Sequence, residues 1–240
     1  MKAYSINKMT RFLAVAGKGG AGKTTTAINL ASALKGYGRE VVLVDANLKS
    51  PHIALHLGAT TVKNTIHDVL LGMKRIRDSA YLHISGLHVI PGSISPEKQE
   101  AASSENTRKH LLDLVGTGEM VIMDTGNDSI DIKNVMKAAD ELLIVTTSDL
   151  PSVTEALKIS RKARTMGLTV IGAVVNRIRQ QNHEMDIQNI EAMLDMPVIA
   201  TINEDKAISE SLVMRHPVVY SHPESRAAKD FRLLAAKLIG

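Results

Sequence analysis

Short apolar runs alternate with longer segments of helical character along most of the chain. The runs are continuous rather than alternating between apolar and polar residues, which is typical of strands covered by helices on both faces of a sheet. They predict strands at residues 12–16, 41–45, 87–91, 120–124, 142–146, 169–175 and 198–202. The segments between them predict helices at residues 24–35, 105–115, 152–166, 185–194, 204–214 and 223–239.

Strands that alternate with helices predict a mostly parallel sheet with right-handed crossovers. The 240 residues are near the upper size for one hydrophobic core, and no repeat or long linker divides them. We therefore predict one doubly wound α/β domain over residues 12–240, with helices on both faces of the sheet and a polar lead-in at residues 1–11. No apolar run approaches the roughly 18 residues that span a bilayer, and no signal peptide precedes the first strand, so we expect a cytoplasmic protein.

Composition narrows the classes of function. The absence of cysteine excludes disulfides, thiolate catalysis and cysteine-ligated metal centres, and it fits a reducing compartment. The formal charge of +4 permits contact with nucleic acid or anionic lipid without requiring either. With two Phe, four Tyr and no Trp, stacking of bases on aromatic side chains is a poor recognition mode for this chain.

A phosphate-binding pattern lies between the first predicted strand and the first predicted helix. Residues 17–24 read Gly-Lys-Gly-Gly-Ala-Gly-Lys-Thr and match G-x-x-x-x-G-K-[ST]. At a helix N-terminus, exposed backbone N–H groups and the helix dipole favour an anion, and glycine lets the backbone approach it closely. We predict that Lys23 reaches the β and γ phosphates of a nucleotide and that the Thr24 hydroxyl ligates Mg²⁺. The residues predicted to surround the phosphates are Gly17, Gly19, Gly20, Ala21, Gly22, Lys23, Thr24 and Thr25.

Two predicted strands end in an aspartate. Asp45 closes residues 41–45 and Asp124 closes residues 120–124. Ligands of open α/β sheets bind beyond the carboxyl ends of the strands, and carboxylates beside apolar strands are unfavourable unless they serve a cation or a hydrogen-bond network. We assign Asp124 to Mg²⁺ together with Thr24 and Asp45. A turn-capping role is the alternative for Asp124.

The second lysine of the loop, Lys18, makes the pattern more specific. A lysine directly after the first glycine resembles the deviant Walker A loop of the MinD/ParA family of ATPases. The segments Val-Val-Asn-Arg-Ile178 and Pro223-Glu-Ser-Arg-Ala-Ala-Lys229 look most like archaeal MinD-type, septum site-determining sequences, and the resemblance covers about residues 12–239. It implies a P-loop fold, Mg²⁺ and ATP, hydrolysis to ADP and phosphate, and a homodimer in the ATP state in which Lys18 reaches the partner's nucleotide. Cluster-carrying relatives need cysteines and are excluded.

The chain departs from the family at residue 47. The family typically shows V-D-x-D, in which the second acid orients the attacking water, whereas this chain has Asn47 after Asp45 and Ala46. An amide orients water but cannot act as a general base, so we expect slow hydrolysis. An asparagine with a purely structural role in a turn is an equal alternative.

The resemblance also assigns five residues farther along the chain. It implies that Glu155 engages the signature lysine, although an acid stabilised by the helix dipole explains that position equally well. It places Asn176 and Arg177 at the adenine edge, and Asn203 and Glu204 in a loop that flanks the base. Asn203 stands where the family usually has proline.

The function implied by the resemblance is a switch for spatial positioning, of a division site or a similar target, with an unidentified activator or cargo protein. A ParA-like, nucleotide-gated partition protein that binds DNA non-specifically is the alternative, because residues 158–164 carry four basic side chains. Peripheral membrane attachment through the last helix is a further alternative. We favour core packing for that helix, since Phe231, Leu234 and Leu238 recur at helical spacing.

Overall fold

The computed structural model describes residues 10–59, 62–127 and 129–240. Its sheet has the strand order β3-β4-β2-β5-β1-β6-β7-β8 in the described residues, with β3 antiparallel to β4 and every other neighbouring pair parallel. The strands are β1 Arg11–Gly17, β2 Val41–Ala46, β3 Tyr81–Leu82, β4 His88–Ile90, β5 Met120–Thr125, β6 Glu141–Thr147, β7 Thr169–Ile178 and β8 Val198–Asn203. This is the predicted doubly wound α/β fold.

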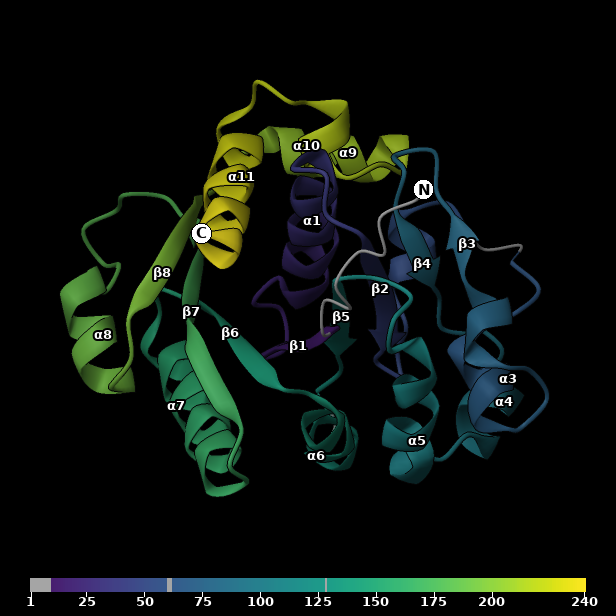
Figure 1. Cartoon of the computed structure of the whole chain (residues 1–240). Helices are drawn as coiled ribbons and strands as arrows, with labels where there is room; N and C mark the ends of the chain where they lie inside the picture. The colour runs from purple at the N-terminus through teal and green to yellow at the C-terminus, as the bar shows by residue number, and fades with distance from the viewer. Residues whose placement is uncertain (1–9, 60–61, 128) are drawn as a thin grey trace, which may run out of the picture.

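Helices cover both faces of the sheet (Figure 1). One layer contains α1 Lys23–Gly36, α9 Lys206–Met214, α10 Val218–Ser221 and α11 Arg226–Ile239. The other contains α3 Ile66–Leu70, α4 Pro96–Ala101, α5 Thr107–Leu111, α6 Ser129–Ala138, α7 Leu150–Thr165 and α8 Ile187–Leu194. The short helix α2 Ile53–His56 follows β2, and the 3₁₀ turns η1 Ile76–Ser79, η2 Ser104–Asn106 and η3 Leu112–Leu114 complete the elements.

Two buried clusters, one on each face of the sheet, explain why the central strands read as continuous apolar runs. Phe12 and Ala14 of β1 belong to one cluster, and Leu13 and Val15 belong to the other. Because both faces are covered, neither set of alternating side chains meets water.

All seven predicted strands are present, and the differences concern short elements. The predicted helix at 105–115 is a single five-residue α-helix between two 3₁₀ turns. We did not predict α2, α3, α4, α6, α10 or the two-residue β3. Most of these elements have six residues or fewer, too short for a clear period, and they form because tertiary contacts hold them. The predicted lead-in at residues 1–11 falls largely outside the described residues.

The last helix packs on the core as we favoured. Phe231 and Leu234 are fully buried, and Leu238 packs against the same cluster. The described part of the chain contains no helix that is both long and apolar enough to cross a bilayer.

Two neighbouring leucines of α11 give a matched test of this packing. Leu234 is completely buried, whereas Leu233 is 64% exposed. We expect Leu234→Ala to lower the free energy of unfolding by about 2–5 kcal/mol, because it removes buried methyl groups and leaves a cavity. Leu233→Ala should cost less than about 1 kcal/mol in the same urea titration. Equal losses in the two variants would contradict the packing of α11.

Candidate functional site

The predicted phosphate loop lies between β1 and α1, at the carboxyl end of the sheet. Gly22 precedes α1 with φ 93°, in the left-handed region that favours glycine. A Cβ on Gly22 would lie 2.1 Å from Asn176 Nδ2, and a Cβ on Gly17 would lie 1.9 Å from the carbonyl oxygen of Val145. The glycines therefore allow the close approach of neighbouring strands to the loop as well as its tight turn.

The two predicted aspartates lie side by side. Asp45 of β2 and Asp124 of β5 are register partners, and both are completely buried. Burial raises the pKa of Asp124 to about 7, against a hydrogen bond from Thr24 and the nearby charge of Lys23. Burial, then the neighbouring Asp124, also raises the pKa of Asp45 well above its usual range. Two buried carboxylates at this spacing favour a shared proton or a cation.

Asp124 has the free acceptor that a cation needs. Its Oδ2 accepts a 2.6 Å hydrogen bond from Thr24 Oγ1, whereas its Oδ1 is buried without a hydrogen-bond partner among the described residues. By contrast, both oxygens of Asp45 accept backbone hydrogen bonds, from Asn47 N at 3.3 Å and Ile53 N at 3.0 Å. Asp45 thus holds the turn after β2, whereas Asp124 and Thr24 offer oxygen atoms that can bind a cation.

The oxygen atoms of Asp124 and Thr24 suit Mg²⁺ better than a metal ion whose ligands all come from protein side chains. The described residues contain no group of three or more His, Cys, Asp or Glu side chains able to hold a metal ion. Mg²⁺ commonly binds through one or two carboxylates, substrate phosphates and water. The Thr24 hydroxyl at the start of α1 and the Asp124 carboxylate at the end of β5 match this preference, because a bound phosphate would supply the remaining oxygen ligands.

The two lysines of the loop occupy different surroundings. Lys23 is 7% exposed, and its Nζ donates to the carbonyl of Lys18 at 3.2 Å and to Asn127 Oδ1 at 2.7 Å. Burial lowers the pKa of Lys23, and Asp124 partly opposes that shift. Lys18 has a half-exposed side chain whose Nζ lies 3.8 Å from Asp149 Oδ1. Lys23 therefore points into the molecule, and Lys18 lies on its surface.

Two clefts open beside the loop. One, of about 400 Å³, is lined by Lys18 to Ala21, by the start of α7, by Arg177 at the end of β7 and by Arg179 and Glu184 beyond it. The other, of about 250 Å³, is lined by residues that include Lys18, Asn127 and Glu155. Loops from β1, β5, β6 and β7 thus converge on one surface, as expected at the carboxyl edge of a parallel sheet.

Asn47 is held in a turn by its own side chain. Its Nδ2 donates to the carbonyl of Ser50, and its Oδ1 accepts from Ser50 N at 3.3 Å. A Cβ on Gly126 would lie 2.4 Å from Asn47 Oδ1, so the two loops after β2 and β5 touch here. This arrangement favours the structural alternative for Asn47, since both ends of its amide are occupied within the turn.

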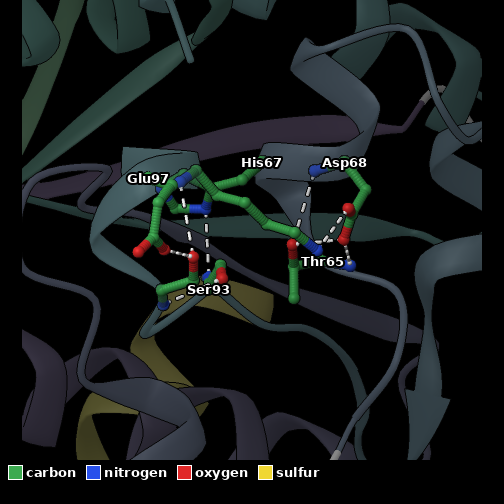
Figure 2. A network of polar contacts seen from close by, with 7 residues as sticks. Thr65, His67, Asp68, Ser93 and Glu97 are labelled. Atoms are coloured by element: carbon green, nitrogen blue, oxygen red, sulfur yellow. Dashed lines mark hydrogen bonds and ion pairs between the residues drawn. The ribbon is translucent and has the colours of Figure 1, made fainter. Parts of the chain in front are cut away.

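A buried hydrogen-bond network around His67 contacts the same turn, and Figure 2 shows His67, Asp68 and Ser93 of this network. Ser93 N donates to His67 Nδ1 at 3.0 Å, so the ring proton lies on Nε2 and is donated to the carbonyl of Leu48 at 2.9 Å. Burial lowers the pKa of His67, which agrees with this neutral form. Beside it, Asp68 of α3 accepts from Thr65 and pairs with Lys98 of α4 at 2.6 Å. The segment after Asn47 is thereby tied to the loop after β4.

Glu155 and Lys18 line the same cleft, yet each has another partner. Glu155 pairs with Lys158 one turn along α7 at 3.2 Å, and Lys18 pairs with Asp149. In the described residues, Glu155 and Lys18 thus each form an ion pair of their own. Asp149 also caps α7, accepting from Ser152 N at 3.0 Å.

The four residues assigned to the base lie at the ends of β7 and β8. Asn176 is buried; its Nδ2 donates to the carbonyl of Ala21 at 2.8 Å, and its Oδ1 accepts from Arg177 N. Arg177 is exposed and has φ 57°. Asn176 thus connects β7 directly to the phosphate loop.

The β8 loop is held by residues that we did not predict. Asn203 donates through its backbone N and its Nδ2 to Asp230 of α11, both at 2.9 Å. Glu204 pairs with Arg179, whose Nη2 donates to Oε1 at 2.8 Å. Glu184 accepts backbone hydrogen bonds from Arg179 and Gln181 and closes the loop after β7. Asp230 lies 27 residues from Asn203, and Arg179 lies 25 residues from Glu204, so no local pattern indicates these two partners.

Two further residues were missed close to the phosphate loop. Asn127 follows the Asp124-Thr125-Gly126 segment, and only the folded chain brings it to Lys23. Asp149 did carry a signal, since an aspartate before Leu-Pro-Ser is a typical helix N-cap.

A family model described as the CobQ/CobB/MinD/ParA nucleotide binding domain matches residues 12–218. The chain belongs to this family. An ATP-binding protein of Methanocaldococcus jannaschii is 34% identical over 98% of this chain and 90% of its own length. The predictions of a MinD/ParA-type ATPase and of its fold are confirmed at the level of the family.

Two solved structures resemble the chain over nearly its whole length. The cell division ATPase MinD of Pyrococcus furiosus is 31% identical with a TM-score of 0.92, covering 96% of this chain and 99% of its own. The septum site-determining protein MinD of Pyrococcus horikoshii OT3, complexed with Mg-ADP, is 29% identical with a TM-score of 0.91, covering 96% of each chain.

The raised pKa of Asp124 makes a prediction about stability in this MinD/ParA-type protein. The folded pKa of about 7 lies above the usual value of 3.8, so the folded state binds the proton more tightly. This contribution is fully present at low pH and is lost as the pH rises toward and through 7. Without Mg²⁺, Asp124→Asn should therefore gain stability relative to the natural chain between pH 5 and pH 8, in urea titrations with EDTA. If the difference in unfolding free energy between the two proteins did not change with pH, the raised pKa of Asp124 would be contradicted.

Proposed function

We propose that this protein is a Mg²⁺–ATP-dependent dimerisation switch of the MinD/ParA type that hydrolyses ATP slowly. The observation that carries the proposal is the separation of the two lysines of the loop. Lys23 is buried beside Asp124, whereas Lys18 lies at the surface, with its amine 3.8 Å from a half-exposed aspartate. An exposed ion pair of this kind is weak, so Lys18 exchanges it readily for a phosphate brought by a second subunit.

Within one subunit the loop would hold the phosphates through Gly17 to Thr25. Thr24 and Asp124 would hold Mg²⁺, which lowers the charge on the phosphates when it is bound, and Asp45 would position the turn after β2. The unpartnered Oδ1 of Asp124 supports this assignment. The complex of the Pyrococcus horikoshii relative with Mg-ADP supports the choice of ligand.

The base would lie between the loops that follow β7 and β8. Asn176 and Arg177 form one wall and Asn203 and Glu204 the other. The hydrogen bonds from Asn176 to Ala21 and from Arg179 to Glu204 keep these loops at fixed positions relative to the phosphate loop. Such preorganisation reduces the entropy lost on binding.

Hydrolysis would be slow because the chain places an occupied amide where its family resemblance implies an acid. Asn47 holds Ser50 at both ends of its side chain, and an amide is no general base. The output of the switch would then be the dimer held by ATP, rather than turnover, since only differential affinity shifts a two-state equilibrium.

The cellular role would be spatial positioning, with an activator or cargo protein that binds one nucleotide state. Septum site-determining proteins among the relatives support this role. The basic residues of α7 give less support to DNA binding, because Lys158 pairs with Glu155 and Arg164 pairs with Asp195.

Light scattering tests the dimer. With Mg²⁺–ATP we expect a homodimer, with ADP a monomer, and for Lys18→Ala with ATP a monomer that still binds nucleotide. Lys23→Ala is the control that should lose nucleotide binding itself. A monomer under every condition, or a dimer that persists in Lys18→Ala, would contradict the switch.

Steady-state phosphate release tests the role of position 47. We expect Asn47→Asp to raise ATP turnover by about tenfold, because it supplies a carboxylate that can orient and deprotonate water. Asn47→Ala is the control: like Asn47→Asp it removes the hydrogen bond from Asn47 Nδ2 to Ser50, and it adds no base. Unchanged or slower turnover in Asn47→Asp would refute the explanation for slow hydrolysis.

A further inference from the structure

We propose that Asn127 is an internal ligand of the phosphate-loop lysine, and that its amide competes with nucleotide phosphate for Lys23. This inference rests on the proposed binding of nucleotide at the loop. It adds a residue that competes for the same atom and therefore sets the affinity of the site.

The contact is short and involves a buried charge. Asn127 Oδ1 accepts from Lys23 Nζ at 2.7 Å, which is shorter than the 3.2 Å bond from the same nitrogen to the Lys18 carbonyl. A buried ammonium group has three donors and a large cost of desolvation, so each acceptor it finds stabilises it substantially. Asn127 is the side chain that supplies one of these acceptors.

The amide also lies directly over the loop. A Cβ built on Gly19 would lie 3.2 Å from Asn127 Nδ2, so the two ends of the amide face Gly19 and Lys23. A P-loop lysine reaches the β and γ phosphates, and backbone N–H groups of the same loop cradle phosphate. The side-chain amide of Asn127 thus faces both Lys23 and the part of the loop where the phosphates of a nucleotide would bind.

The competition has a defined direction. Both bonds have the charged ammonium as donor, but a phosphate oxygen also carries charge and adds Coulomb attraction that a neutral amide oxygen lacks. Nucleotide therefore wins at sufficient concentration, but its net affinity is reduced by the bond between Asn127 and Lys23 that it must break.

Displacement of Asn127 would affect the segments on either side of it. A Cβ built on the preceding residue, Gly126, would lie 2.4 Å from Asn47 Oδ1 of the turn after β2. Helix α6 begins two residues later at Ser129, and its Ile132 lines the 250 Å³ cleft together with Asn127 and Lys18. Asn127 thus connects occupation of Lys23 to the surface on which Lys18 lies.

Isothermal titration calorimetry with Mg²⁺–ATP and Mg²⁺–ADP tests the inference. We expect Asn127→Ala to lower Kd by about tenfold, the size expected for removal of a competing hydrogen bond to a charged group. Asn127→Asp should raise Kd by at least about tenfold, because its carboxylate binds Lys23 more strongly and repels phosphate. Asn189→Ala, at an exposed position of α8, is the matched control and should change Kd by less than about twofold.

A spectroscopic measurement separates competition from a general effect on folding. The side-chain amide signal of Asn127, assigned by its loss in Asn127→Ala, should shift when Mg²⁺–ADP is added to the natural chain. Unchanged or weaker binding by Asn127→Ala, or an amide signal that does not respond, would overturn the inference while leaving nucleotide binding in place. Failure of the natural chain and of all variants to bind nucleotide would remove the proposed function and the inference together.

Discussion

The pair of buried carboxylates at the ends of β2 and β5 is the constraint on which the rest of the site depends. Asp45 and Asp124 are register partners in a parallel sheet, and both are completely buried. Their mutual repulsion is moderated by Thr24 and Lys23 of the phosphate loop and by two backbone N–H groups that follow β2. The phosphate loop, the turn after β2 and the strand β5 are therefore held in one arrangement by the same charges.

A second consequence is that the loops around the site are tied to one another. Asn176 joins β7 to the phosphate loop, His67 joins the turn after β2 to the loop after β4, and Asn127 joins the loop after β5 to Lys23. Each tie is a hydrogen bond between segments far apart in the sequence. On our proposal, a phosphate that competes for one of them, at Lys23, would perturb a connected set of loops rather than one side chain.

The parts of the site that could be predicted from the sequence are those whose functional residues lie within a short motif or at the end of an apolar strand. The glycines and lysines of the phosphate loop sit in one eight-residue stretch, and Asp45 and Asp124 each close an apolar strand. The partners of Lys18, Asn203 and Glu204 could not be predicted in this way. Asp149, Asp230 and Arg179 compete for or support these groups only after β6, β7 and α11 are packed together.

The sequence by itself determined the seven predicted strands, the phosphate loop and its second lysine, because apolar periodicity and glycine positions act over a few residues. Tertiary structure alone decided the roles of Lys23, Lys18, Asn47 and Asn127. Burial and hydrogen-bond partners set these roles. In the folded chain Lys23 points inward and Lys18 lies at the surface. Asn47 is hydrogen-bonded to Ser50, and the Oδ1 atom of Asn127 lies 2.7 Å from the Nζ atom of Lys23. The contact between Lys23 and Asn127 joins segments 104 residues apart, so no local pattern records it.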